Sequence, residues 1–138
     1  MNKKVSITEQ IKTFEDACKV LELNPENLPI VEHLPEKDRK SIIAYYKLIV
    51  IARALNEGWE PDFSDWNQLK YWNWFYASNG ASAGFVCAST YYTASRTSAR
   101  IGSRLCFKTR DLATFAREQF RDLYFEYLFI EMPKNYGK

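Results

Sequence analysis

Residues 70–95 read "KYWNWFYASNGASAGFVCASTYYTAS", and this stretch decides which fold the sequence predicts. Residues 70–78 and 84–95 are rich in aromatic and β-branched side chains, as is typical of strands. Asn79-Gly80 lies between them, and this dipeptide accepts the positive φ angles of a tight hairpin turn. A third segment of similar texture, "RIGSRLCFK", occupies 100–108. We therefore predict a three-stranded antiparallel meander in this part of the chain.

Helix signals precede the meander. Residues 13–16, "TFED", fit a capping box, in which a Thr and an acidic residue three positions later accept hydrogen bonds from backbone N–H groups. This pattern predicts a short helix that runs to about Leu21. A second helix is expected to begin near Pro35, which suits a first-turn position, and to run to residue 56 or 57. Gly58 is expected to be its left-handed cap.

A third helix is expected after the meander, where Thr109 can cap residues 110–132. The predicted fold class is α+β, a three-stranded antiparallel meander packed by three helices in the order α-α-β-β-β-α. A chain of 138 residues with 46% apolar and 26% charged residues is typical of one folded domain. Within 1–138 we expect a helical half at 1–65, an aromatic β-meander at 66–109 and the C-terminal helix.

No pattern in the sequence predicts an active site. Gly80 to Gly84, "GASAG", match the Gly-x-Ser-x-Gly motif of hydrolases, but that nucleophile needs a helix directly after it and a later histidine. Strand-like residues follow Ser82, which we interpret as a hairpin serine, and the single histidine, His33, precedes it. Phosphate-loop and zinc-helix patterns are also missing from the sequence. We expect a protein that is not an enzyme, with no catalytic residue, no cofactor and no metal site.

The cysteines and the apolar runs bear on location. The three cysteines are Cys18, Cys87 and Cys106. Their odd number and wide spacing predict reduced thiols. Cys106 is expected to react first if Arg104 and Lys108 share its face, because nearby cations favour the thiolate. The chain opens on a polar stretch, and its longest apolar run, 42–52, is shorter than the ~20 residues of a membrane span. We expect a cytoplasmic protein with no membrane partner.

The aromatic part of the chain is also basic. No acidic residue lies between Asp65 and Asp111, whereas this interval carries six Lys or Arg residues in a chain of net charge +2. Period-two alternation along the third predicted strand places its cations on one face. The candidate binding residues are aromatic side chains of the first predicted strand and these cations: Trp72, Trp74, Tyr76, Arg100, Arg104 and Lys108. This basic aromatic face is a solvated outer surface, a contact for an acidic protein surface, or a site for single-stranded nucleic acid.

Two helical stretches are apolar on nearly all sides. The segments "IIAYYKLIVIA" at 42–52 and "LYFEYLFIEM" at 123–132 lack the polar half of a surface helix. Other apolar residues of the C-terminal helix, at helical spacing, already form a complete core-facing stripe. Phe125, Leu128 and Phe129 point away from this stripe. We expect these side chains to be buried by a second copy in a homo-oligomer, or by another protein. The alternative is that the second helix or the "KYWNWF" strand covers them within one chain.

Four segments carry a resemblance over nearly the whole chain. They are "TFEDACKVLELNPENLP", "IIAYYKLIVIARALNEGWEPD", "KYWNWF" and "GSRLCFKTRDLATFAREQF", of which "ALNEGW" and "GSRLCFKT" are distinctive. In these segments the chain resembles a family of small uncharacterised proteins from gut Bacteroides, their prophages and their phages. The resemblance implies a mobile-element origin and a location in the host cytoplasm or in association with the virion. It assigns no catalytic residue, because the family has no established activity.

These observations predict a non-enzymatic phage or prophage accessory protein that acts by binding or assembly. Its protein–protein contacts would use the basic aromatic β-face and the apolar helices. The alternative is a protein that binds single-stranded nucleic acid through the same residues.

Overall fold

The computed structural model describes residues 4–77, 86–93 and 102–131. The helices in this part of the chain are α1 (Ile7–Gln10), α2 (Phe14–Val20), α3 (Glu36–Leu55), α4 (Arg110–Gln119) and α5 (Arg121–Leu128). The other elements are two strands, β1 (Lys70–Ala77) and β2 (Val86–Thr93), and one turn of 3-10 helix, η1 (Ser103–Leu105). The described chain is therefore mostly helical, with a single pair of antiparallel strands.

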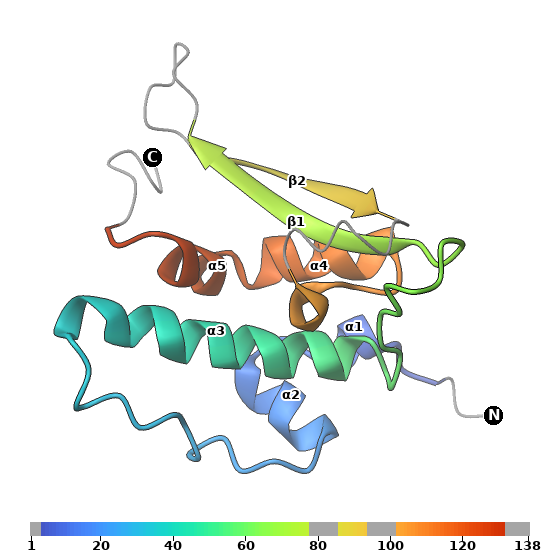
Figure 1. Ribbon diagram of the computed structural model, residues 1–138. Helices are drawn as coiled ribbons and strands as arrows, with labels where there is room; N and C mark the ends of the chain where they lie inside the picture. Colours follow the sequence, from blue (N-terminus) through green and yellow to red (C-terminus); the bar gives the residue numbers. More distant parts are fainter. Residues whose placement is uncertain (1–3, 78–85, 94–101, 132–138) are drawn as a thin grey trace.

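The elements stack in layers around α3 (Figure 1). This long helix packs against α2 on one side and against α5 on the other. The two strands lie over α4, and both contact it. Because α3, α4 and α5 all lie on the same side of the strands, the sheet has one covered face and one face that no described helix covers.

The predicted three-stranded meander is wrong. β1 pairs with β2 from Lys70↔Thr93 to Ala77↔Val86, but the third predicted strand, 100–108, does not form over its described residues. Only Phe107 pairs with Tyr71, as an isolated antiparallel bridge with N–H···O distances of 2.7 and 3.0 Å.

Two local features stop this third strand on either side of the bridge. Ahead of it, Gly102 has a φ of 80° and the chain turns into η1, so Leu105 is in a 3-10 helix where a strand residue was expected. After it, Thr109 already caps α4. Cys106 is 1% exposed, as are Leu105 and Phe107, so the burial does not alternate as a strand with one solvent face would require. The predicted hairpin turn at Asn79-Gly80 and Ser82 lie outside the described residues.

The N-terminal helix predictions are confirmed. Thr13 and Asp16 form the expected capping box: the Asp16 N–H donates to the Thr13 hydroxyl, and the Asp16 carboxylate accepts from the backbone of Lys12 and Thr13. Hydrogen bonds from these N–H groups lower the pKa of Asp16. α3 ends at Leu55, and Gly58 has the expected positive φ, 89°. Among the described helices, none is long and apolar enough to cross a membrane.

The single C-terminal helix predicted at 110–132 is two helices. Phe120 leaves the helical conformation, with φ −115° and ψ 29°, and separates α4 from α5. Because of this break, helical spacing that begins in α4 no longer identifies the residues of α5 that face the core. Phe125, which we expected on the surface, is 0% exposed, whereas Leu128 is 40% exposed. The argument for an oligomer that buries Phe125 is therefore wrong.

Candidate functional site

β1 has two unlike faces. Asn73 and Phe75 point into the core and are 4% and 9% exposed. Trp72 and Trp74 alternate with them and belong to the opposite face, where Trp74 is 46% exposed. α4 covers the inner face, and no described helix covers the outer one (Figure 1). Trp72 is only half-buried on that outer face, although its indole nitrogen is buried.

A buried hydrogen-bond network fixes this orientation of β1. The side-chain amide of Asn73 donates to the Ala113 carbonyl of α4 at 2.8 Å and to the Tyr124 hydroxyl at 3.2 Å. Its oxygen accepts from the Thr90 hydroxyl of β2 at 2.9 Å. Burial raises the pKa of Tyr124, so its hydroxyl stays neutral. Since buried polar groups are costly without partners, these bonds hold Asn73 inward and the tryptophans outward.

Two arginines of α4 reinforce the network from the side of β2. Arg117 donates to the Thr90 hydroxyl at 3.1 Å, and Arg110 donates to the Thr90 carbonyl at 3.2 Å. The guanidinium of Arg110 also lies 5.4 Å from the centre of the Tyr71 ring, within cation–π distance. Arg110 therefore ties α4 to both strands.

Lys70 is likewise part of the fold. Its side chain is 0% exposed, and its ammonium group donates to the carbonyls of Asp65 and Gln68 at 3.2 and 2.8 Å. It also lies 5.2 Å from the centre of the Phe63 ring. These contacts pin the loop before β1 across the start of the strand. Lys70 is therefore absent from the basic surface that the sequence suggested, whereas Arg110 stays exposed while it bonds to β2.

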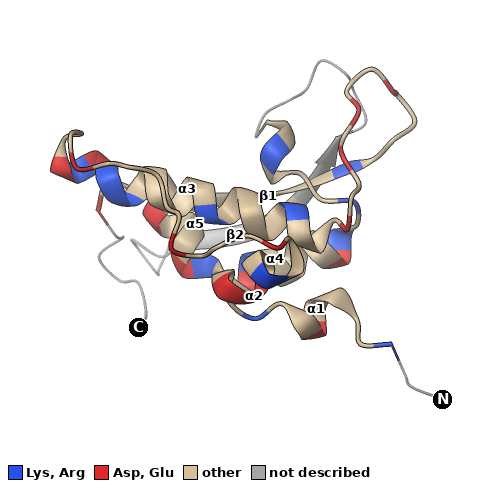
Figure 2. Cartoon of the chain, turned by 90° about the horizontal axis from the view of Figure 1, so that it is seen from below, with Lys and Arg blue, Asp and Glu red and all other residues tan. Residues whose placement is uncertain are grey.

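The other predicted cations do not form a row. Arg104 is exposed in η1 and Lys108 is exposed after the Phe107 bridge, so they do not share the face of a strand. Figure 2 shows basic residues spread over α3, β1 and η1 instead of gathered on one element. Tyr76 belongs to β1, but its side chain, like the whole of Arg100, lies outside the described part of the chain.

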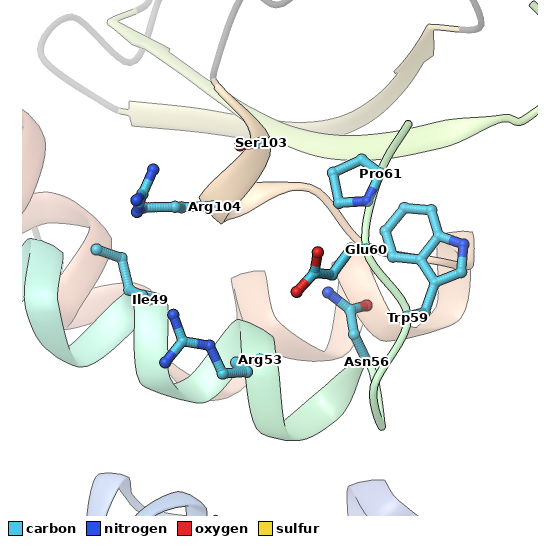
Figure 3. A pocket seen from close by; sticks show the side chains of 8 residues that line it. All are labelled: Ile49, Arg53, Asn56, Trp59, Glu60, Pro61, Ser103 and Arg104. Carbon is cyan, nitrogen blue, oxygen red and sulfur yellow. The ribbon is translucent and has the colours of Figure 1, made fainter. Parts of the chain in front are cut away.

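Arg104 instead lines a pocket of about 220 Å³ beside the C-terminal end of α3 (Figure 3). The polar residues that line it are Arg53, Asn56, Glu60, Ser103 and Arg104, and the apolar ones are Ile49, Trp59 and Pro61. In Figure 3 the carboxylate of Glu60 faces the side of the pocket from which Arg53 and Arg104 extend. Within the described residues, neither arginine forms an ion pair.

The C-terminal end of α3 positions two segments that line this pocket, the chain around η1 and the residues that follow the helix. Asn56 is 4% exposed; its amide donates to the Cys106 carbonyl at 2.9 Å, and its oxygen accepts from the Lys108 N–H at 3.0 Å. This clamp holds the segment that includes η1 against the helix. The two residues after Asn56 have positive φ angles of 48° and 89°, and this left-handed turn is followed by Trp59 and Glu60.

The sequence analysis missed Arg53, Trp59 and Glu60. A usable signal was the Gly58 cap, because a chain that reverses there returns past the last helical turn, which carries Arg53. Nothing local indicated that Arg104 would join them. That juxtaposition depends on the side chain of Asn56, which bridges positions 50 residues apart.

The expected reactivity of Cys106 is also corrected. Its side chain is 1% exposed, and its thiol donates to the Gly102 carbonyl at 3.3 Å. Burial raises the pKa of Cys106 to about 11, so the group stays a thiol near neutral pH. The thiolate is the nucleophile, and Cys106 is therefore an unreactive core residue.

Comparison with protein-family models, curated proteins and solved structures gives no match to this chain. Within the described chain, the outer face of β1 and the pocket at the end of α3 are the two candidate binding surfaces.

Proposed function

We propose that this chain is a non-catalytic accessory protein of a phage or prophage that binds another protein through the outer face of β1. The observation that carries the proposal is Trp74, which is 46% exposed on the strand face opposite Phe75. Alternation along β1 places the half-buried Trp72 on the same face. Exposed tryptophan is unfavourable in water and is enriched at the energetic centres of protein contacts. The mobile-element origin rests on the resemblance of the sequence segments.

The charge beside this face indicates what kind of surface the partner offers. Lys108 is exposed directly after Phe107, which pairs with the Tyr71 position of β1. A cation at the edge of an aromatic centre matches a partner that surrounds an apolar depression with acidic residues. We therefore expect a partner with an acidic rim.

Single-stranded nucleic acid is the second candidate, since tryptophan next to lysine can combine base stacking with a phosphate contact. The structure supports it less, because Lys70 and Arg110 are engaged within the fold and Arg104 lines a pocket that also contains Glu60. Few cations are left to follow a phosphate backbone along the face of the strand.

Capture from Bacteroides host cells tests the proposal. Tagged wild-type protein is compared with Trp74→Ser and with Ile30→Ser, which removes another large apolar side chain that is 78% exposed elsewhere. We expect one protein to be retained by the wild type and by Ile30→Ser, and to be lost with Trp74→Ser. Retention by all three proteins would contradict the proposal.

The same three proteins are titrated with single-stranded oligonucleotides of mixed sequence. Nucleic-acid binding would show log affinity falling linearly with log salt, with a slope of about 0.7 per phosphate contacted. If binding with that slope appears and Trp74→Ser weakens it, the second candidate replaces the first. We expect no such binding.

A further inference from the structure

The pocket at the end of α3 carries opposite charges on opposite sides. Arg53 comes from the last turn of the helix and Arg104 from η1, and Glu60 faces them across the space (Figure 3). All three side chains belong to exposed residues, and none forms an ion pair within the described chain. Two guanidinium groups are suited to a planar carboxylate, and one carboxylate is suited to an ammonium group.

The size and the charge of the pocket restrict its ligand. A volume of about 220 Å³ admits a small molecule but not a nucleic-acid strand. Glu60 would repel a second negative charge, which disfavours a phosphate dianion compared with a carboxylate. Ile49, Trp59 and Pro61 supply apolar surface for a side chain.

We propose that this pocket binds a free α-amino acid. The carboxylate of the ligand lies between Arg53 and Arg104, its ammonium group faces Glu60, and its side chain contacts the apolar lining of the pocket. Such a zwitterion pairs with charges of both signs in the pocket at once, which neither a simple anion nor a simple cation does. The site is separate from the outer face of β1, so the proposal does not depend on the protein-binding function.

The walls of the pocket are held in place before any ligand arrives. Asn56 fixes the chain around η1 to α3 through its bonds to Cys106 and Lys108, at 2.9 and 3.0 Å. This clamp limits how far Arg104 can move from Arg53. A preformed site loses less conformational entropy on binding, which favours measurable affinity for a small ligand.

Calorimetric titration of the full chain with each standard L-amino acid, at concentrations up to about 1 mM, tests the proposal. We expect at least one amino acid to bind. Its amide, which lacks the carboxylate, and its N-acetyl derivative, which lacks the ammonium group, should each bind about tenfold more weakly or worse. Absence of binding by every amino acid, or binding of inorganic phosphate alone, would overturn the proposal.

Variants locate the ligand. Arg53→Met and Arg104→Met should each weaken amino-acid binding by about tenfold or more, and Lys19→Met, which removes an exposed cation from α2, should not change it. Glu60→Gln should weaken binding of the amino acid but leave binding of its N-acetyl derivative unchanged. The site assignment fails if Lys19→Met weakens binding as much as the pocket variants, or if the pocket variants leave it unchanged.

Discussion

At the scale of single residues, the side chain of Asn56 forms hydrogen bonds to backbone groups that a neighbouring strand would otherwise satisfy. In an antiparallel ladder the neighbours of the paired Phe107 direct their backbone groups away from β1. Asn56 forms hydrogen bonds with two of these groups. Its amide N–H donates to the Cys106 carbonyl, and its amide oxygen accepts from the Lys108 N–H. One buried amide therefore replaces the ladder partner that the segment lacks on that side.

Replacing Asn56 with Ala should lower the free energy of unfolding by about 2–4 kcal/mol, because it leaves one buried and one half-buried backbone group without partners. Urea denaturation measures the change. Lys40→Ala, at an exposed position of the same helix, is the control and should stay within about 0.5 kcal/mol of the wild type. Equal stability of the two variants would mean that the clamp does not matter.

The buried thiol of Cys106 makes stability depend on pH. Its pKa is raised from 9.0 to about 11 in the folded chain, so the stabilisation is complete below pH 9 and is lost as the pH rises toward 11. The free energy of unfolding should fall by at most about 1.4 kcal/mol per pH unit in this window. Cys106→Ala should make the fall between pH 9 and 10 less steep without abolishing it, because burial also raises the pKa of Cys18. An unchanged slope in that variant would contradict the assignment.

At the scale of elements, the sequence predicted what local signals determine. The capping box at Thr13 and Asp16 and the stop at Gly58 depend on neighbouring residues only, and both helices formed as expected. The third strand and the phase of the last helix were wrong, because each depends on a local break: η1 after Gly102, and Phe120. An apolar pattern shows which residues are buried more reliably than it shows the backbone that buries them.

In the candidate site, too, some features follow from the sequence pattern and others only from the folded chain. Alternation along β1 places Trp74 on the face opposite Phe75, but the sequence does not tell which of the two faces is exposed. The buried bonds of Asn73 decide this in the structure. The burial of Lys70 and the bond from the exposed Arg110 to β2 could not be predicted, since their acceptors are backbone carbonyls that only the folded loop and β2 present. Counting charges along the sequence therefore overestimates a basic surface.

Gly102 tests the account of the missing strand. Its φ of 80° and ψ of 160° fall in a region that is nearly restricted to glycine, although no atom lies close enough to contact an added Cβ. Gly102→Ala should therefore destabilise the protein by about 1–3 kcal/mol through backbone strain alone. Ser103→Ala, at the next and exposed position, should be neutral in the same thermal unfolding experiment. A neutral Gly102→Ala would show that the turn is not required.

At the scale of the whole molecule, α5 separates core packing from self-association. Phe125 lies 5.4 Å from Phe75 and 5.7 Å from Phe129 between ring centres, and it is fully buried. Phe125→Ala should cost about 3–5 kcal/mol of stability, and Phe125→Glu should unfold the chain. Leu128→Glu should leave it folded, because Leu128 is 40% exposed. Circular dichroism distinguishes these outcomes, and a folded Phe125→Glu would refute the packing described for α5.

Any contact between copies of the chain must then use other residues than Phe125. Leu128 and Ile130 are exposed at 40% and 78% near the end of α5. Sedimentation of the wild type at tens of micromolar, next to Leu128→Glu, shows whether these residues hold two copies together. This question is independent of the open face of β1.

The central claim is that the helices of this chain hold one face of β1 in the core so that Trp74 on the other face can bind a protein. The most direct test is the affinity of the captured partner for the purified wild type and for Trp74→Ser, measured by calorimetry. We predict that Trp74→Ser raises Kd by about 30-fold or more, whereas Ile30→Ser leaves it within about twofold. An equal Kd for Trp74→Ser and the wild type, with both proteins folded, would contradict the claim.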